Sequence, residues 1–319
     1  VFVGNSGFAQ VGNIGLVVNF SYNGAIPPAA CNSFYNMAQI IIGEEITSIG
    51  NNAFYQANVS TIEDLPDSIT TIGDYAFTGS SIISLRLSRS ITSIGAYAFD
   101  RCRSLVKINL PDSLTTIGTL AFNNCFALQQ LTVNVYFPNL ASYFNNSYVN
   151  KIIFDYIGPI PDLVCNYNAN LKTLILGQSI TGIGNQSFNN CPLLESVTLP
   201  DTVTSIGTRA FSGCASLKKI SIPAYVSNIG VGAFACPSLT DVYFLSTSIP
   251  LLTDNGYNNF VNTNDTGYYV TGARNLSRIT PLFTNLAVQL VVYSIPLFFR
   301  SLSIHQFSSS QLLSCETFQ

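Results

Sequence analysis

The sequence has little charge and only one histidine, and each scarcity argues against a class of function. Charged residues make up 9% of the 319 residues, whereas a soluble domain usually carries about 25%. The formal net charge is −3 and no basic stripe occurs, so nucleic acid is not expected as a partner because nothing would neutralise its phosphates. Asn, Ser and Thr must therefore supply most of the polar surface.

The residues that carry chemistry are equally sparse. The only histidine, His305, lies in a Ser-rich tail, so a hydrolase triad or a metal site lacks the partnered His that it needs. No Cys-x-x-Cys suggests zinc and no Asp-x-Asp suggests calcium. We therefore expect no enzyme, no catalytic residue, no metal and no cofactor.

What the sequence does contain is a repeat. The segment Ile91-Thr92-Ser93-Ile94-Gly95, followed by Ala98-Phe99, returns 23 residues later at Leu114–Gly118 with Ala121-Phe122, and again at Val203–Gly207 with Ala210-Phe211. A fixed period of 20–29 residues is typical of a solenoid. The starts of the coils are Ile26, Ile46, Ile69, Ile91, Leu114, Phe137, Ile160, Ile180, Val203 and Val226.

One coil can be interpreted in physical terms. Leu217-x-x-Ile220-x-Ile222 alternates with period 2, which predicts a strand with one buried face. Pro223 turns the corner, Val226 and Ile229 form a second short buried segment, and Gly230 allows a turn that a Cβ would hinder. We expect Ala233-Phe234 to form one helical turn or a 3₁₀ piece whose Phe fills the interior. Each coil then covers the next.

Five of the eight cysteines follow the repeat. Cys102, Cys125, Cys191, Cys214 and Cys236 each come two or three residues after the coil Phe, so we expect a buried column of reduced thiols that act as small apolar residues. Cys31, Cys165 and Cys315 lie outside the regular coils, and the sequence does not decide whether a disulfide forms among them.

The pattern Leu-x-x-Ile-x-Leu-Pro-x-x-Leu-Thr-x-Ile-Gly-x-x-Ala-Phe-x-x-Cys resembles the BspA-type, or Treponema-type, leucine-rich repeat, best seen at 91–125 and 180–234. The coils at 137 and 160, and Glu63, depart from it. The resemblance implies a right-handed, β-rich leucine-rich-repeat solenoid of about ten coils of 20–23 residues, on proteins typically displayed at a cell surface for adhesion or host interaction. It implies no catalysis and an extracellular or cell-surface location.

The two ends are expected to differ from the array. We predict an N-terminal cap at 1–25, repeats at 26–248, and a C-terminal cap or assembly segment at 249–319. Residues 279–299 form a charge-free run between Arg278 and Arg300. That length spans a bilayer, but Pro281, Asn285, Gln289 and Pro296 interrupt the run. Packed strands are therefore favoured and a membrane anchor remains the alternative.

The candidate binding face follows from the strand alternation, since every second residue of each strand points outward. The residues that we single out are Arg86, Lys107, Lys151, Ile153, Ile175, Lys219 and Tyr243. We expect this face to bind a protein partner, in recognition or adhesion. The alternative is a structural subunit of a filament, sheath, surface layer or virion, a homo-oligomer or polymer that assembles through its uncharged ends.

Overall fold

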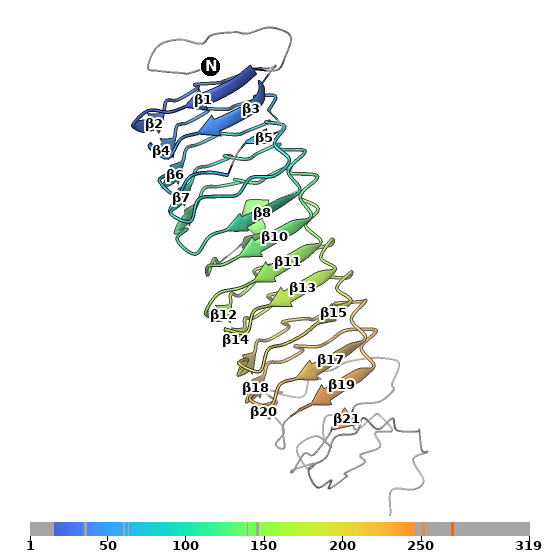
Figure 1. Cartoon of the computed structure of the whole chain (residues 1–319). Coiled ribbons are helices and arrows are strands. Elements are labelled where there is room, and N and C mark those ends of the chain that lie inside the picture. Colours follow the sequence, from blue (N-terminus) through green and yellow to red (C-terminus); the bar gives the residue numbers. More distant parts are fainter. Residues whose placement is uncertain are drawn as a thin grey trace, which may run out of the picture.

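The computed structural model describes residues 16–34, 37–59, 61–62, 64–138, 140–144, 147–245, 251–252 and 269–270. Within them the chain winds as a parallel β-solenoid of about ten turns (Figure 1). The described part contains a single helix, the 3₁₀ helix η1 (Leu140–Phe144). The predicted fold class is confirmed.

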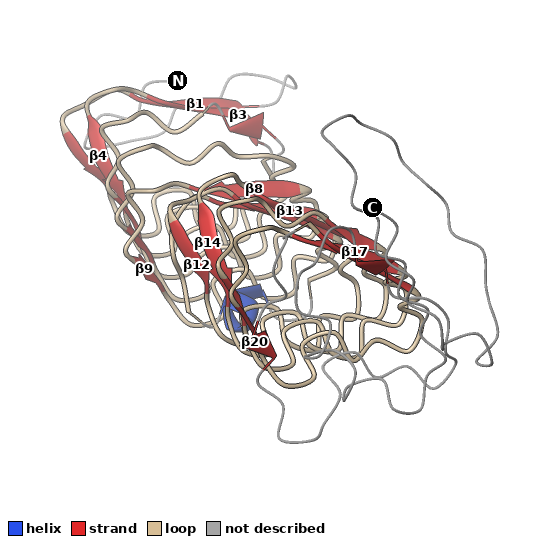
Figure 2. Cartoon of the chain, turned by 90° about the horizontal axis from the view of Figure 1, so that it is seen from below, coloured by secondary structure: helices blue, strands red, loops and turns tan. Residues whose placement is uncertain are grey.

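Each coil has three sides (Figure 2), and every strand pairing is parallel. The front sheet contains β1 (Leu16–Phe20), β3 (Met37–Ile42), β5 (Thr61–Ile62), β8 (Lys107–Leu110), β10 (Gln130–Val133), β11 (Lys151–Phe154), β13 (Thr173–Leu176), β15 (Ser196–Val197), β17 (Lys219–Ile222), β19 (Asp241–Phe244) and β21 (Tyr269–Val270). It forms three hydrogen-bonded groups, β1-β3-β5, β8-β10-β11-β13-β15 and β17-β19-β21.

The side sheet follows the corner after the front sheet. It contains β2 (Gly24–Ile26), β4 (Ile46–Ile49), β6 (Thr71–Ile72), β7 (Ser93–Ile94), β9 (Thr116–Ile117), β12 (Gly158–Ile160), β14 (Ile180–Ile183), β16 (Ser205–Ile206), β18 (Asn228–Ile229) and β20 (Leu251–Leu252). It is divided between β9 and β12, where the repeat motif is least regular. Polar side chains tie successive coils together at the corner, as where the Ser113 hydroxyl donates to the carbonyl oxygen of Ile91 (2.7 Å).

On the third side, the turn edge, only the coil with η1 is helical within the described residues; the helical turn predicted at Ala233-Phe234 is wrong, since these residues form hydrogen-bonded turns. Alternate amides donate to the next coil: Tyr75 to the oxygen of Ala96 and Phe77 to that of Ala98 (2.9 and 2.7 Å). The intervening Thr78 amide closes a local turn on Tyr75 (3.1 Å). This alternation between inter-coil bonds and local turns requires two residues per coil in the left-handed conformation, such as Tyr75 and Gly79, with φ of 56° and 69°. The local sequence did not disclose it, because most of these positions are not glycine.

The repeated glycine after the side-sheet strand has a different role from the one that the sequence suggested. A Cβ on Gly118 would lie 2.2 Å from the Ala96 amide nitrogen, and one on Gly95 would lie 2.5 Å from that of Asp74. The glycines therefore let the backbones of successive coils approach, and a left-handed φ is not the reason. The same close approach recurs at Gly50, Gly73, Gly184, Gly207 and Gly230.

The interior is organised around a column of phenylalanine rings. Phe54, Phe77, Phe99, Phe122 and Phe144 stack at successive centroid distances of 5.1, 5.2, 5.0 and 4.7 Å. A second stack, Phe188, Phe211 and Phe234, has spacings of 5.3 and 5.4 Å. These distances are close to the strand spacing of about 4.8 Å, so the coil repeat itself sets the ring stacking.

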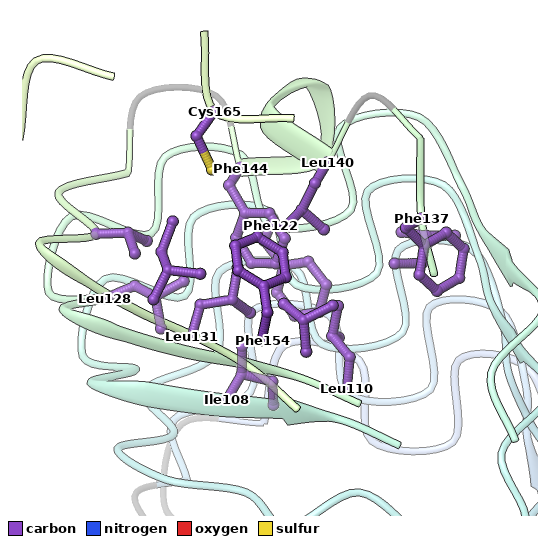
Figure 3. Close-up of a cluster of buried hydrophobic side chains, with 14 of the residues drawn as sticks. Ile108, Leu110, Phe122, Leu128, Leu131, Phe137, Leu140, Phe144, Phe154 and Cys165 are labelled. Carbon is purple, nitrogen blue, oxygen red and sulfur yellow. The ribbon is translucent and has the colours of Figure 1, made fainter. Parts of the chain in front are cut away.

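The two stacks are separated by one coil in which Cys165 takes the place of Phe. A second exception compensates nearby: Phe154, at the end of β11, stands where β8 and β13 have Leu110 and Leu176. The Phe154 ring packs edge-on against Phe188 at 6.1 Å. Both Phe154 and Cys165 belong to the buried cluster (Figure 3). The large side chain has thus moved from the turn edge to the front sheet.

The array includes the parallel pairs β1–β3 and β2–β4, so the described coils begin at Leu16. The predicted boundaries at 25/26 and 248/249 remain predictions. Glu63, His305, Cys315 and the run at 279–299 lie outside the described residues. Within the described part no helix is long and apolar enough to cross a bilayer.

The glycine column can be tested at Gly118. Replacement by Ala puts a methyl group against backbone that cannot move without breaking inter-coil hydrogen bonds, so we expect unfolding free energy to fall by about 2–3 kcal/mol in urea denaturation. Gly79→Asn is the matched control, since Asn124 and Asn190 hold the equivalent left-handed position; we expect a change within about 1 kcal/mol. Equal losses in both variants would contradict the explanation.

The exchange between Phe154 and Cys165 can be tested by a double-mutant cycle. Phe154→Leu leaves a void and Cys165→Phe overfills the same interior, so each should lower the unfolding free energy by about 1–3 kcal/mol. The double variant restores the ring column and should lose at least about 1 kcal/mol less than the sum. Strict additivity, measured by urea denaturation, would show that the two positions do not share one space.

Candidate partner-binding face

The outward residues of the front sheet form two columns in the predicted register. In the first column Gln130 pairs with Lys107 on one side and Lys151 on the other; in the second, Ile153 pairs with Ile175. Farther along, Lys219 pairs with Asp241 and Ser221 with Tyr243. Arg86 precedes this group, since Ser84 bridges to Lys107. The geometry that we predicted for the candidate residues is therefore present, whereas their role in binding stays a prediction.

Alternation explains why these side chains face outward. Along β8 and β17 the residues are alternately exposed and buried, so that Lys107 and Lys219 lie outside while Ile108 and Ile220 enter the core. Lys151 and Ile153 are half-buried by their neighbours. The outward side chains of the face are mostly hydroxyls, amides and aliphatic chains, with the lysines among them.

The apolar part of the face is shorter than a continuous strip. Ile153 and Ile175 are direct neighbours and Ile175 is 41% exposed. Tyr243 lies in the separate group β17-β19-β21, beyond Thr198 and Ser221 of the same column. Two apolar patches therefore replace the single strip that the column in the sequence suggested.

Arg86 differs from the other cations of the face because it has a partner. Its Nε donates to Oδ2 of Asp64 at 2.7 Å, and both side chains are about half exposed or more. The hydrogen bond to Asp64, followed by the attraction of that charge, raises the pKa of the guanidinium. Arg86 is thus held in place across one strand and is less available to a ligand than the lysines.

Two cations and an aromatic pair of this region were not predicted from the sequence. Lys172 and Lys218 come just before strands β13 and β17 and are exposed, and their position next to the alternating residues could have indicated it. At the border of the turn edge, exposed Phe126 lies 6.1 Å from Tyr148, and the Arg103 guanidinium lies over the Phe126 ring at 5.8 Å. This contact depends on coil stacking, which no single coil reveals.

The cysteine column is a structural feature. The seven described cysteines are buried and free. The Cys125 thiol donates to the carbonyl oxygen of Phe99 in the preceding coil (3.1 Å), and Ser147 does the same toward Phe122 in a coil without the cysteine. Burial raises the pKa of Cys31 and of Cys102 to about 12. The hydrogen bond that each forms with Cys214, followed by burial, raises the pKa of Cys191 and of Cys236. All seven side chains are buried, so none of these thiols is exposed to a substrate.

A hollow of about 330 Å³ opens where the two Phe stacks meet. Its floor includes Leu140, Phe144 and Cys165, and its rim includes Asn166 and Asn168. Its lining contains no carboxylate, histidine or lysine, and its reactive groups are the buried thiol of Cys165 and the hydroxyls of Ser147 and Tyr167. In the described ranges, no group of three or more His, Cys, Asp or Glu is placed to hold a metal.

The repeat motif defines the class of protein. The family described as "BspA type Leucine rich repeat region" matches in six copies at residues 24–152 and 160–281. The chain therefore belongs to the BspA-type leucine-rich-repeat family, whose solenoids suit protein–protein recognition and are typically non-enzymatic.

Solved structures of similar proteins come from several bacteria. The pneumococcal vaccine antigen PcpA is 19% identical, with 90% of this chain and 91% of that chain covered and a TM-score of 0.38. A leucine-rich repeat protein of Bacteroides ovatus is 19% identical, with 88% and 94% covered and a TM-score of 0.38. A leucine-rich cell surface protein of Faecalibacterium prausnitzii is 21% identical, with 83% and 81% covered and a TM-score of 0.33.

The family assignment rests on the repeat motif, and these superpositions add no argument to it. A comparison with curated proteins found no match.

The buried thiols predict how stability depends on pH. The folded pKa of Cys102 is raised to about 12, whereas a thiol in the unfolded chain ionises near pH 8.5. Its contribution is therefore complete below about pH 8.5 and is lost as the pH rises toward about 12. Cys102→Ser should make the fall in unfolding free energy near pH 10 shallower by about 1.4 kcal/mol per pH unit. Urea denaturation under reducing conditions measures this slope, and an unchanged slope would contradict it.

Proposed function

We propose that this chain is a non-enzymatic recognition or adhesion protein of the extracellular space or the cell surface, and that it binds a protein partner through the front sheet. The observation that carries the proposal is the combination of a stacked sheet face, an exposed Ile175 and lysines that form no ion pair within the described residues. Interfaces combine an apolar centre with a polar rim, and solenoids bind along such extended surfaces.

The location rests on the family, since BspA-type repeats are typically associated with surfaces. The description of the Faecalibacterium protein as a cell surface protein supports the same placement for this chain. The low charge fits a role in which the surface is polar without being highly charged.

A structural subunit remains the second candidate. The observation that favours it is the one-way hydrogen bonding of the turn edge, in which each coil donates to the next. Stacked ends of this kind are templates for continued pairing. Sedimentation of the full chain without detergent separates the candidates: polymers support the subunit, and a monomer near 34.5 kDa supports recognition.

The recognition proposal can be tested with photo-crosslinking residues in the cells that make the chain. A benzophenone amino acid placed at Asn109, Thr132 or Thr198, all on the second column of the front sheet, should cross-link to a protein other than the chain itself. The same residue at Asn123 or Ser212, on the turn edge, is the matched control and should not. Cross-links from the turn edge alone, or from no position, would overturn the proposal.

A further inference from the structure

The lysines of this chain are not scattered. All of them, Lys107, Lys151, Lys172, Lys218 and Lys219, lie on the outward positions of the front sheet or on the residue just before a front-sheet strand. Of the arginines, Arg86 lies on this side as well, whereas Arg89 is at the corner and Arg101 and Arg209 are on the turn edge. The chain therefore gathers one kind of cation on one side.

These lysines have no ionic partner within the described residues. The ion pairs found there are Arg86 with Asp64 and Arg101 with Asp100, and neither involves a lysine. Asp241, which is opposite Lys219 in the strand register, accepts a hydrogen bond from the neighbouring Thr240 hydroxyl at 3.2 Å. Five ammonium groups thus remain free to meet an incoming charge.

The charge of the front sheet is opposite in sign to the net charge of the chain. Five lysines and Arg86 give six cations, and the described acids of this side are Asp64, Glu195 and Asp241, which leaves +3 on a chain whose net charge is −3. Six of the other described acids lie at the corner, namely Glu44, Glu45, Asp67, Asp112, Asp155 and Asp201, and the last three, Asp74, Asp100 and Asp162, come after side-sheet strands. Local potential, more than net charge, governs the approach of a partner.

The spacing adds a second constraint. Lys107 and Lys151 lie two strands apart in one column, which is about 9.6 Å at the usual strand spacing. Ile153 and Ile175 lie in the next column beside Lys151 and Thr173. A partner must therefore offer acidic groups about 10 Å apart, close to apolar side chains. In an extended polypeptide of polyproline II conformation, residues three apart lie on the same side and about 9.3 Å apart, which fits this spacing. A uniformly charged polyanion would offer the charges without the apolar groups.

From these observations we infer that the partner of the front sheet is an acidic polypeptide surface, in which Asp or Glu side chains meet the lysines while an apolar side chain covers Ile153 and Ile175. This inference rests on the proposed function and specifies its partner by chemistry. The lysines would steer the encounter and fix the position along the axis, and the isoleucines would supply the desolvated centre.

The experiment is a selection of displayed random peptides on the immobilised full chain, followed by fluorescence anisotropy with the selected peptides. We expect the selected sequences to be rich in Asp and Glu together with apolar residues, and their affinity to fall by about tenfold when the salt is raised from low to physiological. The variant Lys107→Ser/Lys151→Ser should bind them about tenfold more weakly. Serine is chosen because Ser84 and Ser196 already hold positions in this column.

The matched control, Arg89→Ser/Arg209→Ser, removes the same charge from the corner and the turn edge and should bind as the unchanged chain does. Selected peptides that are neutral, and that lose binding in Ile153→Thr/Ile175→Thr and not in the lysine variant, would overturn the acidic partner while leaving the proposed function in place. Peptides that bind all these variants equally, or no bound peptide, would overturn both. If heparin binds the chain and no acidic peptide is selected, the acidic polypeptide is overturned and the partner is a polyanionic glycan.

Discussion

The close approach of successive backbones is the constraint on which the other features depend. Parallel strands about 4.8 Å apart leave no space for a Cβ where the chain leaves the side sheet, so each regular coil has glycine there. The same distance brings the Phe rings into stacking contact and lets thiols, hydroxyls and amides of one coil reach the carbonyl groups of another. A longer coil spacing would lose all of these contacts together.

This constraint explains how the polar groups of a chain with so few charged residues obtain hydrogen-bond partners. Its side-chain hydrogen bonds run mainly between coils, with Ser and Thr at corners and Cys inside, so polar atoms serve the stack before they serve the solvent. In the described part, Asn228 Oδ1 is the buried side-chain oxygen that has no hydrogen-bond partner. The lysine side chains of the front sheet are therefore not needed to hold the coils together.

Much of this architecture could be predicted because each coil repeats the same physical problem. The strand at 219–222, the buried Cys column and the register of the outward columns all followed from period and alternation. The turn edge could not be predicted, since left-handed Tyr75, Leu120 and Arg209 give no local sign of their conformation. The exchange of Phe154 for Cys165 was equally hidden, because it links a strand to a turn in the next coil. On the front sheet, the repeat register predicted the outward position of Lys107. The gap between the two apolar patches could not be predicted, because it depends on where the sheet divides.

The turn edge has one more property, which follows from the direction of its hydrogen bonds. Donors in each coil point toward the C-terminus of the array and acceptors toward the N-terminus, as Cys31 with Ala53 and Phe211 with Ala233 illustrate. The stack is therefore a polar rod along this side, with a head that offers oxygen and a tail that offers N–H groups. Whatever covers the head must be a donor and whatever covers the tail must be an acceptor. A single kind of lid cannot serve both ends, but the head of one such rod has the chemistry to meet the tail of another.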